Sequence, residues 1–474
     1  MITALIMLPI IGSIIIALTS NIRISKLIAL ITSMILIILY VIIWLIYNTN
    51  NNYFQFVEIY NSYYPIQMGI DSISLYMIGL TILLIPVCIL STWSTVKENV
   101  KLYLILFLGL ETILILVFVL LDILLFYITF EASLIPMFLI IGIYGGREKK
   151  IYAAYQFFII TLLGSLLMLL AIIVMYSQIG STEYGILAIS SLSKERESIL
   201  WLALFISFAV KTPLIPVHVW LPEAHSEANI AGSIILAGVL LKLAGYGLIR
   251  YSINILPEGS IYFIPLVYGL SIISIIYSSL TTLRQIDMKK IIAYSSIGHM
   301  GIVMLGIFSY SIEGIEGSII LMIAHGFVSP GLFIIVTALY DRTHTRILKY
   351  YRGVTIGMPV LSIMFFILTL ANMAVPLTGN FVGEFMSFLG AFKANPMATV
   401  LATSGIVLAG GYSIWFYNRV SFGVESVYIG KMKDLDRREV YILLPLIIIT
   451  MIIGVYPNII LESLHIPVSN ILIN

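Results

Sequence analysis

Apolar stretches long enough to cross a lipid bilayer follow one another along almost the whole chain. A helix that crosses the hydrocarbon core needs about 20 consecutive, mostly apolar residues. The stretches predict an all-α polytopic membrane protein with about 14 transmembrane helices, and because they do not alternate with polar residues they exclude a β-barrel. The predicted spans are 2–20, 26–47, 70–92, 100–120, 122–144, 152–178, 200–221, 229–250, 261–283, 289–309, 315–340, 357–391, 396–419 and 440–461.

Composition limits the other classes of protein. Hydrophobic residues make up 60% of the chain and charged residues only 10%, against about half and a quarter in soluble domains. The net charge of +2 comes without a dense basic block, which argues against a nucleic-acid partner. Cys88 is the only cysteine, which excludes an internal disulfide, an iron–sulfur cluster and a Cys-rich zinc site. The first span has no basic n-region or cleavage pattern, so we expect a retained helix rather than a signal peptide.

Lys and Arg concentrate in the odd-numbered loops between the predicted spans. The even-numbered loops hold only Lys194, Arg196, Arg250 and Lys393. This bias is the positive-inside pattern, and it predicts that both chain ends face away from the positive side. The odd-numbered loops contain Arg23, Lys26, Lys97, Lys101, Arg147, Lys149, Lys150, Arg284, Lys289, Lys290, Arg342, Arg346, Lys349, Arg352, Arg419, Lys431, Lys433, Arg437 and Arg438.

Two parts of the chain share a pattern. "TPLIPVHVWLPEAH" is followed by "VLLKLAGYGLIR", and five helices later "VPLTGNFVGEF" is followed by "IVLAGGYSIWFYNR". An odd offset inverts the second unit, as in transporters whose broken helices form sites near the membrane midplane. We therefore expect N-terminal helices 1–3 at 1–98, a first repeat (helices 4–8) at 99–255, an inverted repeat (helices 9–13) at 256–421, and a C-terminal loop and helix at 422–474.

Few ionisable residues lie inside the predicted spans, and burying each costs at least ~2.5–3.5 kcal/mol. Lys211 and Lys242 are the two cations that no loop accounts for. Glu131 and Glu384 are the best-placed acids. Secondary candidates are Glu111, Asp122 near a helix start, and His225.

Lys211 stands beside a predicted helix break. Pro213 and Pro216 each remove a backbone hydrogen bond, and the freed carbonyls are tolerated where they are buried in protein or line a wet cavity. His218 follows seven residues after Lys211, about two turns along the same face if the helix continues. A matching interruption, Pro376 to Gly383, precedes Glu384.

Histidines complete a predicted polar row through the bilayer. His299 lies in "SSIGHMG", and His325 precedes "GFVSPGLF", which predicts another broken helix. Imidazoles titrate near neutral pH and can pass protons in either direction. A metal site is not expected, because His218 and His225 are seven residues apart with Pro222 between them. The sequence lacks a GxGxxG or Walker A motif, so we predict no cofactor, metal or redox site on this chain.

Three long segments carry a family resemblance: "FEASLIPMFLIIGIYGGREKKIYAAYQFFIITLLGS", "KTPLIPVHVWLPEAHSEANIAGSIILAGVLLKLAGYGLIR" and "LRQIDMKKIIAYSSIGHMG". They resemble the NADH dehydrogenase subunit 4 family, one of the antiporter-like membrane subunits of respiratory complex I, which are related to Mrp-type antiporter subunits. The resemblance runs from about residue 70 to 420. A glutamate at position 384, where the other antiporter-like subunits usually have lysine, and the lack of a long C-terminal lateral helix favour subunit 4.

The resemblance implies a proton relay coupled to NADH:ubiquinone oxidoreduction on other subunits. By matching motifs, it assigns Glu131, Lys211, Lys242 and Glu384 to this relay, with His218, His299 and His325 along the same axis. It implies an ion pair between Glu131 and Lys211. NADH, FMN, iron–sulfur clusters and ubiquinone are then bound by other subunits, and the partners are neighbouring membrane-arm subunits and lipids.

Two other functions stay open from the sequence: an Mrp-type Na⁺/H⁺ antiporter subunit and a proton-inert scaffold. Heavy use of Ile, Tyr, Asn and Ser is typical of an AT-rich genome. This composition favours a multi-pass protein of the mitochondrial inner membrane, with a bacterial plasma membrane as the alternative.

Overall fold

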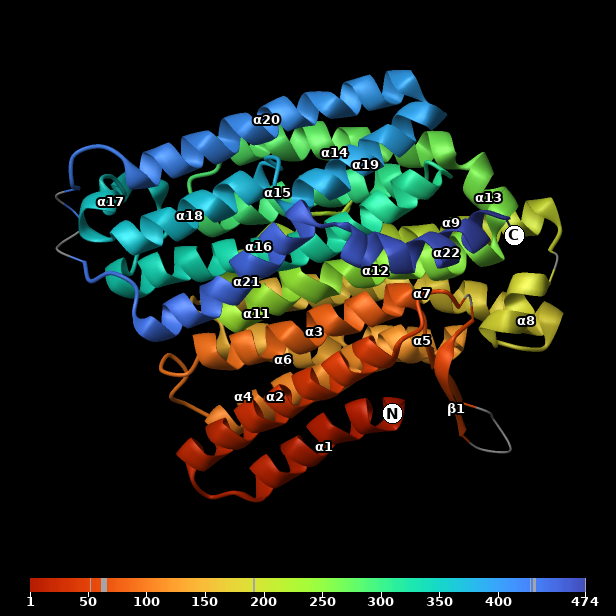
Figure 1. The fold of residues 1–474 in the computed structure, drawn as a ribbon, viewed down its shortest axis with the longest axis horizontal. Coiled ribbons are helices and arrows are strands. Elements are labelled where there is room, and N and C mark those ends of the chain that lie inside the picture. The colour runs from red at the N-terminus through yellow and green to blue at the C-terminus, as the bar shows by residue number, and fades with distance from the viewer. Residues whose placement is uncertain (52, 61–65, 191, 427, 429–431, 474) are drawn as a thin grey trace.

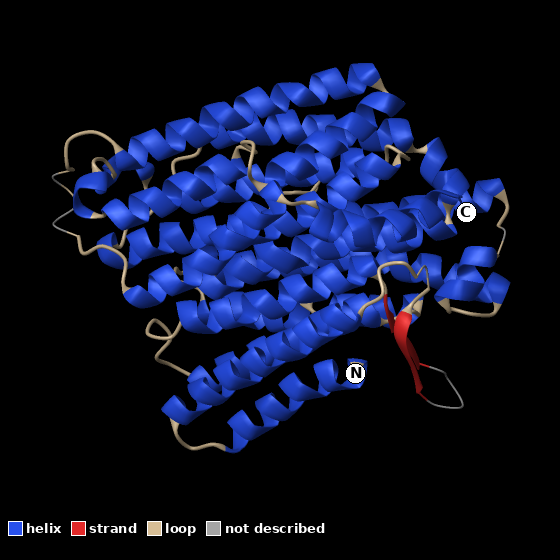
Figure 2. Cartoon of the chain, viewed as in Figure 1, coloured by secondary structure: helices blue, strands red, loops and turns tan. Residues whose placement is uncertain are grey.

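Long helices lying side by side form the body of the molecule (Figure 1). The structure, a computed structural model, describes residues 1–51, 53–60, 66–190, 192–426, 428 and 432–473. Figure 2 shows helix almost throughout, with one hairpin projecting at one end. The predicted class, an all-α polytopic membrane protein, is confirmed. Lys431, which we placed in a loop, lies outside the described residues.

Within these residues, eleven helices are long and apolar enough to cross a membrane. Nine of them are single helices, and the other two contain a break or a change of helix type. They are α2 (Ile22–Ile46), α3 (Ser72–Ser91), α4 (Val100–Val119), α5 with α6 (Ile123–Ala132, Leu134–Tyr144), α7 (Lys150–Ile179), α11 to η2 (Ile230–Ile253), α14 (Ile264–Arg284), α15 (Met288–Ile307), α16 (Ile312–Thr343), α20 (Pro396–Ser421) and α21 (Arg437–Val455).

The remaining helices are shorter or more polar. All fourteen predicted spans fall on helical segments, but the count of fourteen crossings and the inverted repeat stay predictions. Only part of the last helix, α22, was expected. The further elements are α1 (Ile2–Leu18), α8 (Tyr184–Ile189), α9 (Lys194–Lys211), α10 (Trp220–Glu227), α13 (Pro257–Tyr262), η3 (Leu348–Tyr350), α17 (Val354–Gly357), α18 (Pro359–Asn372), α19 (Gly379–Ala394) and α22 (Asn458–Ile473).

A short antiparallel hairpin joins α2 to α3 and was not predicted. Strand β1 (Gln55–Tyr60) pairs with β2 (Ile66–Ile70), with Ile59 opposite Gln67. The hairpin lies between two spans, where the backbone can be polar because it need not cross the hydrocarbon core.

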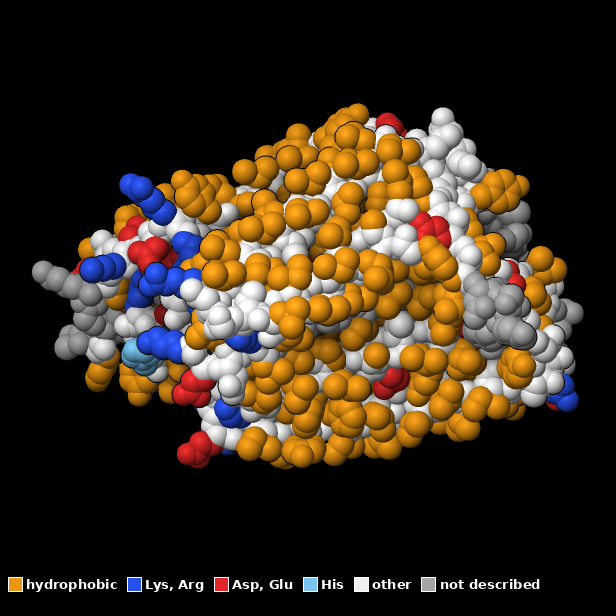
Figure 3. Space-filling model, turned by 90° about the horizontal axis from the view of Figure 1, so that it is seen from below, with side chains coloured by type: hydrophobic (Ala, Val, Ile, Leu, Met, Phe, Trp, Pro, Cys, Tyr) orange, Lys and Arg blue, Asp and Glu red, His pale blue; other side chains and the backbone are white. Residues whose placement is uncertain are grey.

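The surface has the sidedness that the loop charges predict. Figure 3 shows hydrophobic side chains over the middle of the molecule and Lys and Arg side chains gathered at its left end. In Figure 1 the C-terminus lies toward the right, and the N-terminus lies at the right-hand end of α1. The two chain ends therefore point away from the basic end, as the positive-inside pattern predicts.

Two helix breaks occur where prolines predict them, one between α9 and α10 and one between α18 and α19. Helix α9 ends at Lys211, and α10 begins only at Trp220. The carbonyl of Val210, freed at this break, accepts a hydrogen bond of 2.9 Å from the indole of Trp220. Because the chain between α9 and α10 is not helical, Lys211 and His218 do not share a helix face, so that expectation is wrong.

The third expected break is absent from the described helix α16, which runs unbroken through Pro330. All of its most apolar window is buried among neighbouring helices, and packing on every side keeps a helix continuous where proline removes one bond. A different irregularity was missed. Between α11 (Ile230–Ile235) and α12 (Leu241–Gly247) lies a π-helical turn, η1 (Leu236–Leu240), and a second, η2 (Leu248–Ile253), follows α12.

Candidate functional site

Lys242 and His325 meet in the buried interior. Lys242 lies on α12 directly after the π-turn η1, and both side chains are fully buried. The Nζ atom of Lys242 lies 2.9 Å from Nδ1 of His325 and also donates to the carbonyl of Ala237, within η1. A π-turn is wider than an α-helical turn and often marks a functional site. Here it turns a backbone carbonyl toward the ammonium group.

Two glycines allow the helices that carry this pair to approach closely. A Cβ on Gly326 of α16 would lie 3.1 Å from the carbonyl oxygen of Gly238 in η1. A Cβ on Gly238 would lie 3.5 Å from the carbonyl oxygen of Gly326. Small residues at helix crossings are how membrane helices pack tightly. This crossing brings His325 within reach of Lys242.

The second nitrogen of His325 continues the polar row. Nε2 of His325 lies 3.1 Å from the hydroxyl of Ser296 on α15, which is 3.3 Å from the hydroxyl of Ser329. The imidazole of His299, one turn along α15 from Ser296, lies with its ring centroid 5.3 Å from that of His325. Two imidazoles and a hydroxyl are therefore adjacent within the protein interior.

His299 joins this row to Glu384. Nδ1 of His299 lies 2.8 Å from a carboxylate oxygen of Glu384 on α19, and its Nε2 lies 3.2 Å from the side-chain oxygen of Asn372 on α18. All three side chains are buried. Helix α19 follows the break after α18, and Gly383 lets it lie against the backbone of Leu321 in α16. The predicted residues Lys242, His325, His299 and Glu384 are thus brought together.

Glu131 and Lys211 are neighbours but do not form the expected ion pair. Among the described residues, Nζ of Lys211 and Oε1 of Glu131 have no hydrogen-bond partner. Lys211 instead sits over the ring of Phe130, with Nζ 4.5 Å from the ring centroid. The two groups are close enough to interact electrostatically, and Glu131 is in hydrogen-bonding contact with Ser165 of α7. The pair is therefore open in this structure.

The other two candidate histidines have different surroundings. His218 has rings of Tyr277 and Tyr294 at 6.2 Å, and its Nδ1 has no partner within the described chain. His225 on α10 is fully buried and stacks on Phe333 at 4.6 Å. His225 is close enough to Lys242 and His325 to interact with them electrostatically. His225, which the sequence marked only as a secondary candidate, therefore lies near Lys242.

The two remaining secondary candidates have different surroundings. Asp122 caps α5, because its Oδ1 accepts from the backbone of Leu124 and Leu125, and its Oδ2 accepts from the hydroxyl of Thr182 at 2.5 Å. Its place in the structure is that of a helix cap. Glu111 is fully buried on α4, and neither of its oxygens has a hydrogen-bond partner in the described part of the chain.

Sequence reasoning missed a buried ion pair. Arg250, which we assigned to a loop, lies in η2 with 6% of its surface exposed, and its Nη2 is 2.8 Å from Asp71 at the N-terminus of α3. The guanidinium also contacts the hydroxyl of Tyr246 and lies over the rings of Phe54 and Tyr184. The pattern "LAGYGLIR", with Tyr four residues before Arg, was the available signal.

Two further basic residues, also assigned to loops, are buried at the basic end. Nζ of Lys289 donates to the carbonyl of Ala228 at 2.8 Å, and Arg346 donates to the carbonyl of Ser226. These carbonyls lie at the end of α10 and just beyond it. The two cations hold that end of the broken helix in place.

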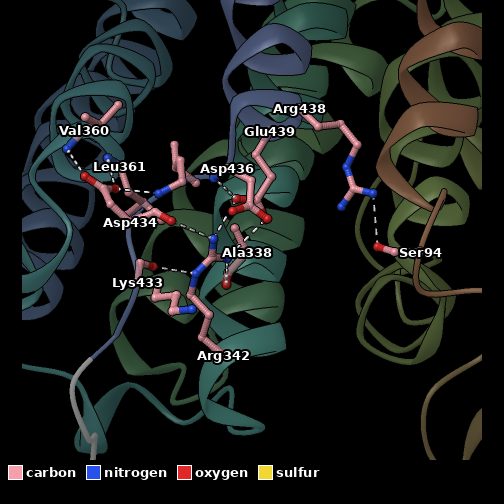
Figure 4. A network of polar contacts seen from close by, with 11 residues as sticks. Ser94, Ala338, Arg342, Val360, Leu361, Lys433, Asp434, Asp436, Arg438 and Glu439 are labelled. Carbon is pink, nitrogen blue, oxygen red and sulfur yellow. Dashed lines mark hydrogen bonds and ion pairs between the residues drawn. The ribbon is translucent and has the colours of Figure 1, made fainter.

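Figure 4 shows a polar network at the same end. Arg342, at the end of α16, binds both carboxylate oxygens of Glu439 on α21 at 2.7 and 3.1 Å and the carbonyls of Lys433 and Asp434. The carboxylate of Asp434 accepts from the backbone of Val360 and Leu361 at the start of α18. This network ties together α16, α18 and α21, and so supports the helices that carry His325 and Asn372.

Across the described residues, no group of three or more His, Cys, Asp or Glu side chains is placed to hold a metal ion. The buried cluster consists of two imidazoles, one ammonium, one carboxylate and hydroxyls. Such groups can hold and pass protons.

Comparisons with known proteins give a consistent family. The model of the family described as "NADH:quinone oxidoreductase/Mrp antiporter, TM" matches residues 120–409. NADH-ubiquinone oxidoreductase chain 4 of Mycosarcoma maydis is 50% identical over 480 residues, covering 100% of this chain and 99% of the relative. The same chain of Marchantia polymorpha is 50% identical over 476 residues, covering 99% and 96%.

Solved structures share the fold. A chain of respiratory complex I from Thermus thermophilus with bound NADH superposes with a TM-score of 0.91 at 28% identity, covering 100% of this chain and 99% of that one. A chain of the Mrp complex from Dietzia sp. DQ12-45-1b gives a TM-score of 0.88 at 17% identity over 99% and 97%. At 17% identity, the match to the Mrp complex shows only that the fold is shared.

Proposed function

The chain belongs to the NADH:quinone oxidoreductase/Mrp antiporter family, and from this premise we propose that it is a proton-translocating membrane-arm subunit of respiratory complex I. The relatives that it matches along its whole length are complex I chain 4 proteins. Electron transfer from NADH to ubiquinone, with its FMN and iron–sulfur clusters, takes place on other subunits. The partners are the neighbouring membrane-arm subunits and lipids, and the location is the mitochondrial inner membrane.

One observation supports the proposal most: the row from Lys242 through His325 and His299 to Glu384 is buried and nearly continuous. Each intramembrane charge is costly, so four ionisable groups in contact need a common role. A row of groups that alternately donate and accept provides one. In this proposal Lys242 is the central proton store and Glu384 the terminal acid.

The steps follow from the donor and acceptor atoms. Protonated Lys242 donates to Nδ1 of His325, and the proton on Nε2 of the same ring leaves toward Ser296. The centroids of His325 and His299 are 5.3 Å apart, which a bridging hydroxyl or water can span. The incoming proton adds to bare Nε2 of His299, and the ring, now protonated on both nitrogens, passes its Nδ1 proton to Glu384. Because these sites interact strongly, their proton affinities belong to the row as a whole.

In this proposal, the opening and closing of the Glu131–Lys211 pair controls when Lys211 releases its proton. Two unit charges 4 Å apart attract by about 4 kcal/mol at an effective dielectric constant of 20, so closing the pair favours a charged Lys211. Opening it, as in this structure, removes that support and favours release of the proton toward Lys242. Lys211 is the last residue of α9, so a small movement of the broken segment can open or close the pair. His225 lies near the Lys242 end of this route.

In the two predicted repeats, Lys211 and Glu384 each lie next to a helix break. In the units 99–255 and 256–421, Lys211 ends a helix before the first break, and Glu384 follows the second. An inverted pair of broken helices offers each side of the membrane its own access, which is the arrangement used for alternating access.

Co-purification tests the assignment to complex I. We expect the chain to purify with NADH:ubiquinone activity and to support proton movement that does not need Na⁺. An Mrp-type Na⁺/H⁺ antiporter subunit would instead purify without quinone-reducing subunits and would move protons only against Na⁺. The 50% identity along the whole chain to complex I subunits favours the first outcome over the fold-level likeness to the Mrp complex.

A further inference from the structure

Asn372 occupies an unassigned place beside the terminal pair. It is the last residue of α18, directly before the second helix break, and is 5% exposed. Its side-chain oxygen lies 3.2 Å from Nε2 of His299, whose Nδ1 lies 2.8 Å from Glu384. His299 is therefore held at both ring nitrogens, by an acid on one side and by an amide on the other.

A neutral imidazole carries a single N–H, so its two nitrogens cannot both donate. When the His299–Glu384 pair holds one exchangeable proton, Nε2–H donates to the Asn372 oxygen. The shared proton then lies between Nδ1 and the carboxylate, on either atom. This loaded state matches the amide orientation in the structure.

When that proton leaves, the pair consists of a neutral imidazole and a carboxylate. The carboxylate can only accept, so the favoured tautomer carries the one remaining proton on Nδ1: the Nε2–H bond breaks and that proton passes to a water, while a water returns one proton to Nδ1. Nε2 is then bare and needs a donor, and the amide can provide one only by turning its NH₂ group toward the ring. Empty and loaded states thus require opposite orientations of the same amide.

We propose that Asn372 is a positioning residue whose amide turns over each time the His299–Glu384 pair gains or loses its proton. The proposal rests on the relay proposed above. Tyr412 of α20 is in hydrogen-bonding contact with Asn372 and Ser295, and its hydroxyl can donate or accept. The hydroxyl can therefore pair with the amide in either orientation.

The charged and titratable groups that face this site come from four helices. They are His299 on α15, Glu384 on α19, Tyr412 on α20 and His325 on α16, with Lys242 behind His325. A carboxylate at position 372 changes one interaction of this set. It can only accept a hydrogen bond from Nε2–H of His299, and it therefore favours the loaded state.

The test uses the intact complex in vesicles, with ubiquinone reduction and proton translocation measured across a range of pH. Asn372→Asp offers only oxygen acceptors, so release from Glu384 becomes harder and we expect the pH dependence of turnover to move about one unit alkaline. Asn372→Leu is expected to lower turnover about tenfold without such a shift, and Asn372→Gln, which keeps an amide, to restore part of it. Thr369→Val, one turn earlier on α18 with its hydroxyl bonded to the carbonyl of Phe366, is the matched control and should leave the pH dependence unchanged.

A second measurement does not depend on assembly of the Asn372 variants. In infrared spectra of the wild-type complex with isotope-labelled asparagine, an amide band should change together with the titration of the Glu384 carboxyl, and Glu384→Gln should abolish the change. An unshifted pH profile in Asn372→Asp, equal losses in the Asp and Leu variants, or an amide band indifferent to Glu384 would overturn the role of Asn372. If Lys242→Ala still abolishes translocation, the relay itself would stand.

Discussion

Nζ of Lys242 and Nδ1 of His325 lie 2.9 Å apart, although the two residues are 83 positions apart in the sequence. Both side chains are fully buried. A buried ammonium next to a neutral imidazole is a donor facing an acceptor. In the proposed relay, a proton passes at this contact from the first half of the chain to the second.

Replacing the acceptor should interrupt this transfer. His325→Leu keeps a buried side chain of moderate size but removes both nitrogens, and we expect turnover coupled to proton translocation to fall roughly a hundredfold. Thr337→Val on the same helix, whose hydroxyl binds only the carbonyl of Phe333, is the control. Similar losses in the two variants would indicate damage to α16 rather than to the relay.

The close crossing of α16 and η1 gives a prediction about glycine. Gly326→Ala places a Cβ 2.7 Å from Leu80 and 3.1 Å from the backbone of Gly238, so the helices must move apart at an expected cost of about 1–3 kcal/mol. Thermal unfolding of the assembled complex should occur at a lower temperature, and turnover should fall as the Lys242–His325 contact lengthens. Gly109→Ala on α4, where a Cβ meets no atom within 4 Å, should have no effect. Equal stability of the two variants would contradict the close crossing.

The buried pair of Arg250 and Asp71 should behave differently from an exposed one. Arg250→Met leaves the carboxylate of Asp71 unpaired beside the hairpin, and breaking a buried pair costs about 3–5 kcal/mol. Asp71→Leu combined with Arg250→Met should recover part of that loss, because no charge stays buried alone. Lys194→Met, which removes a largely exposed pair with Glu258, should change little. A double variant less stable than the single variant would count against this account of the pair.

Variants of Glu131 and Glu111 test whether the acid near Lys211 matters more for turnover than the acid on α4. Glu131→Gln removes the charge that acts on Lys211, and we expect at least a tenfold loss of turnover, in line with the ~1–3 units by which an opposite charge moves a pKa. Glu111→Gln removes an acid without a hydrogen-bond partner in the described chain, and turnover should stay within about twofold. The opposite order of effects would move the coupling role to α4.

Most of the site could be predicted from the sequence, because intramembrane charges are rare and costly. Lys242 and Glu384 are conspicuous in apolar spans, and prolines predict the breaks next to Lys211 and before Glu384. Arg250 shows the limit of this reasoning. It lies at the end of an apolar stretch and looks like a loop cation, and only the folded chain brings Asp71 to within 2.8 Å of it.

Other features depend on packing that no local pattern encodes. Pro330 predicts a break, but neighbours on all sides keep α16 continuous. The π-turn before Lys242 contains no proline from which it could be predicted. The Glu131–Lys211 pair is open, with Lys211 over the ring of Phe130, and the sequence cannot distinguish an open pair from a closed one. The contact of Asn372 with His299 joins two residues that are 73 positions apart in the sequence.

The central claim is that protons pass through Lys242. The most direct measurement is the number of protons translocated per electron by the intact complex in sealed vesicles, with Lys242→Ala compared with Lys194→Ala, which removes a largely exposed lysine. At equal subunit content, the account predicts that Lys242→Ala lowers this ratio or stops turnover altogether, while Lys194→Ala matches the wild type. An unchanged ratio and unchanged turnover in a fully assembled Lys242→Ala complex would contradict it.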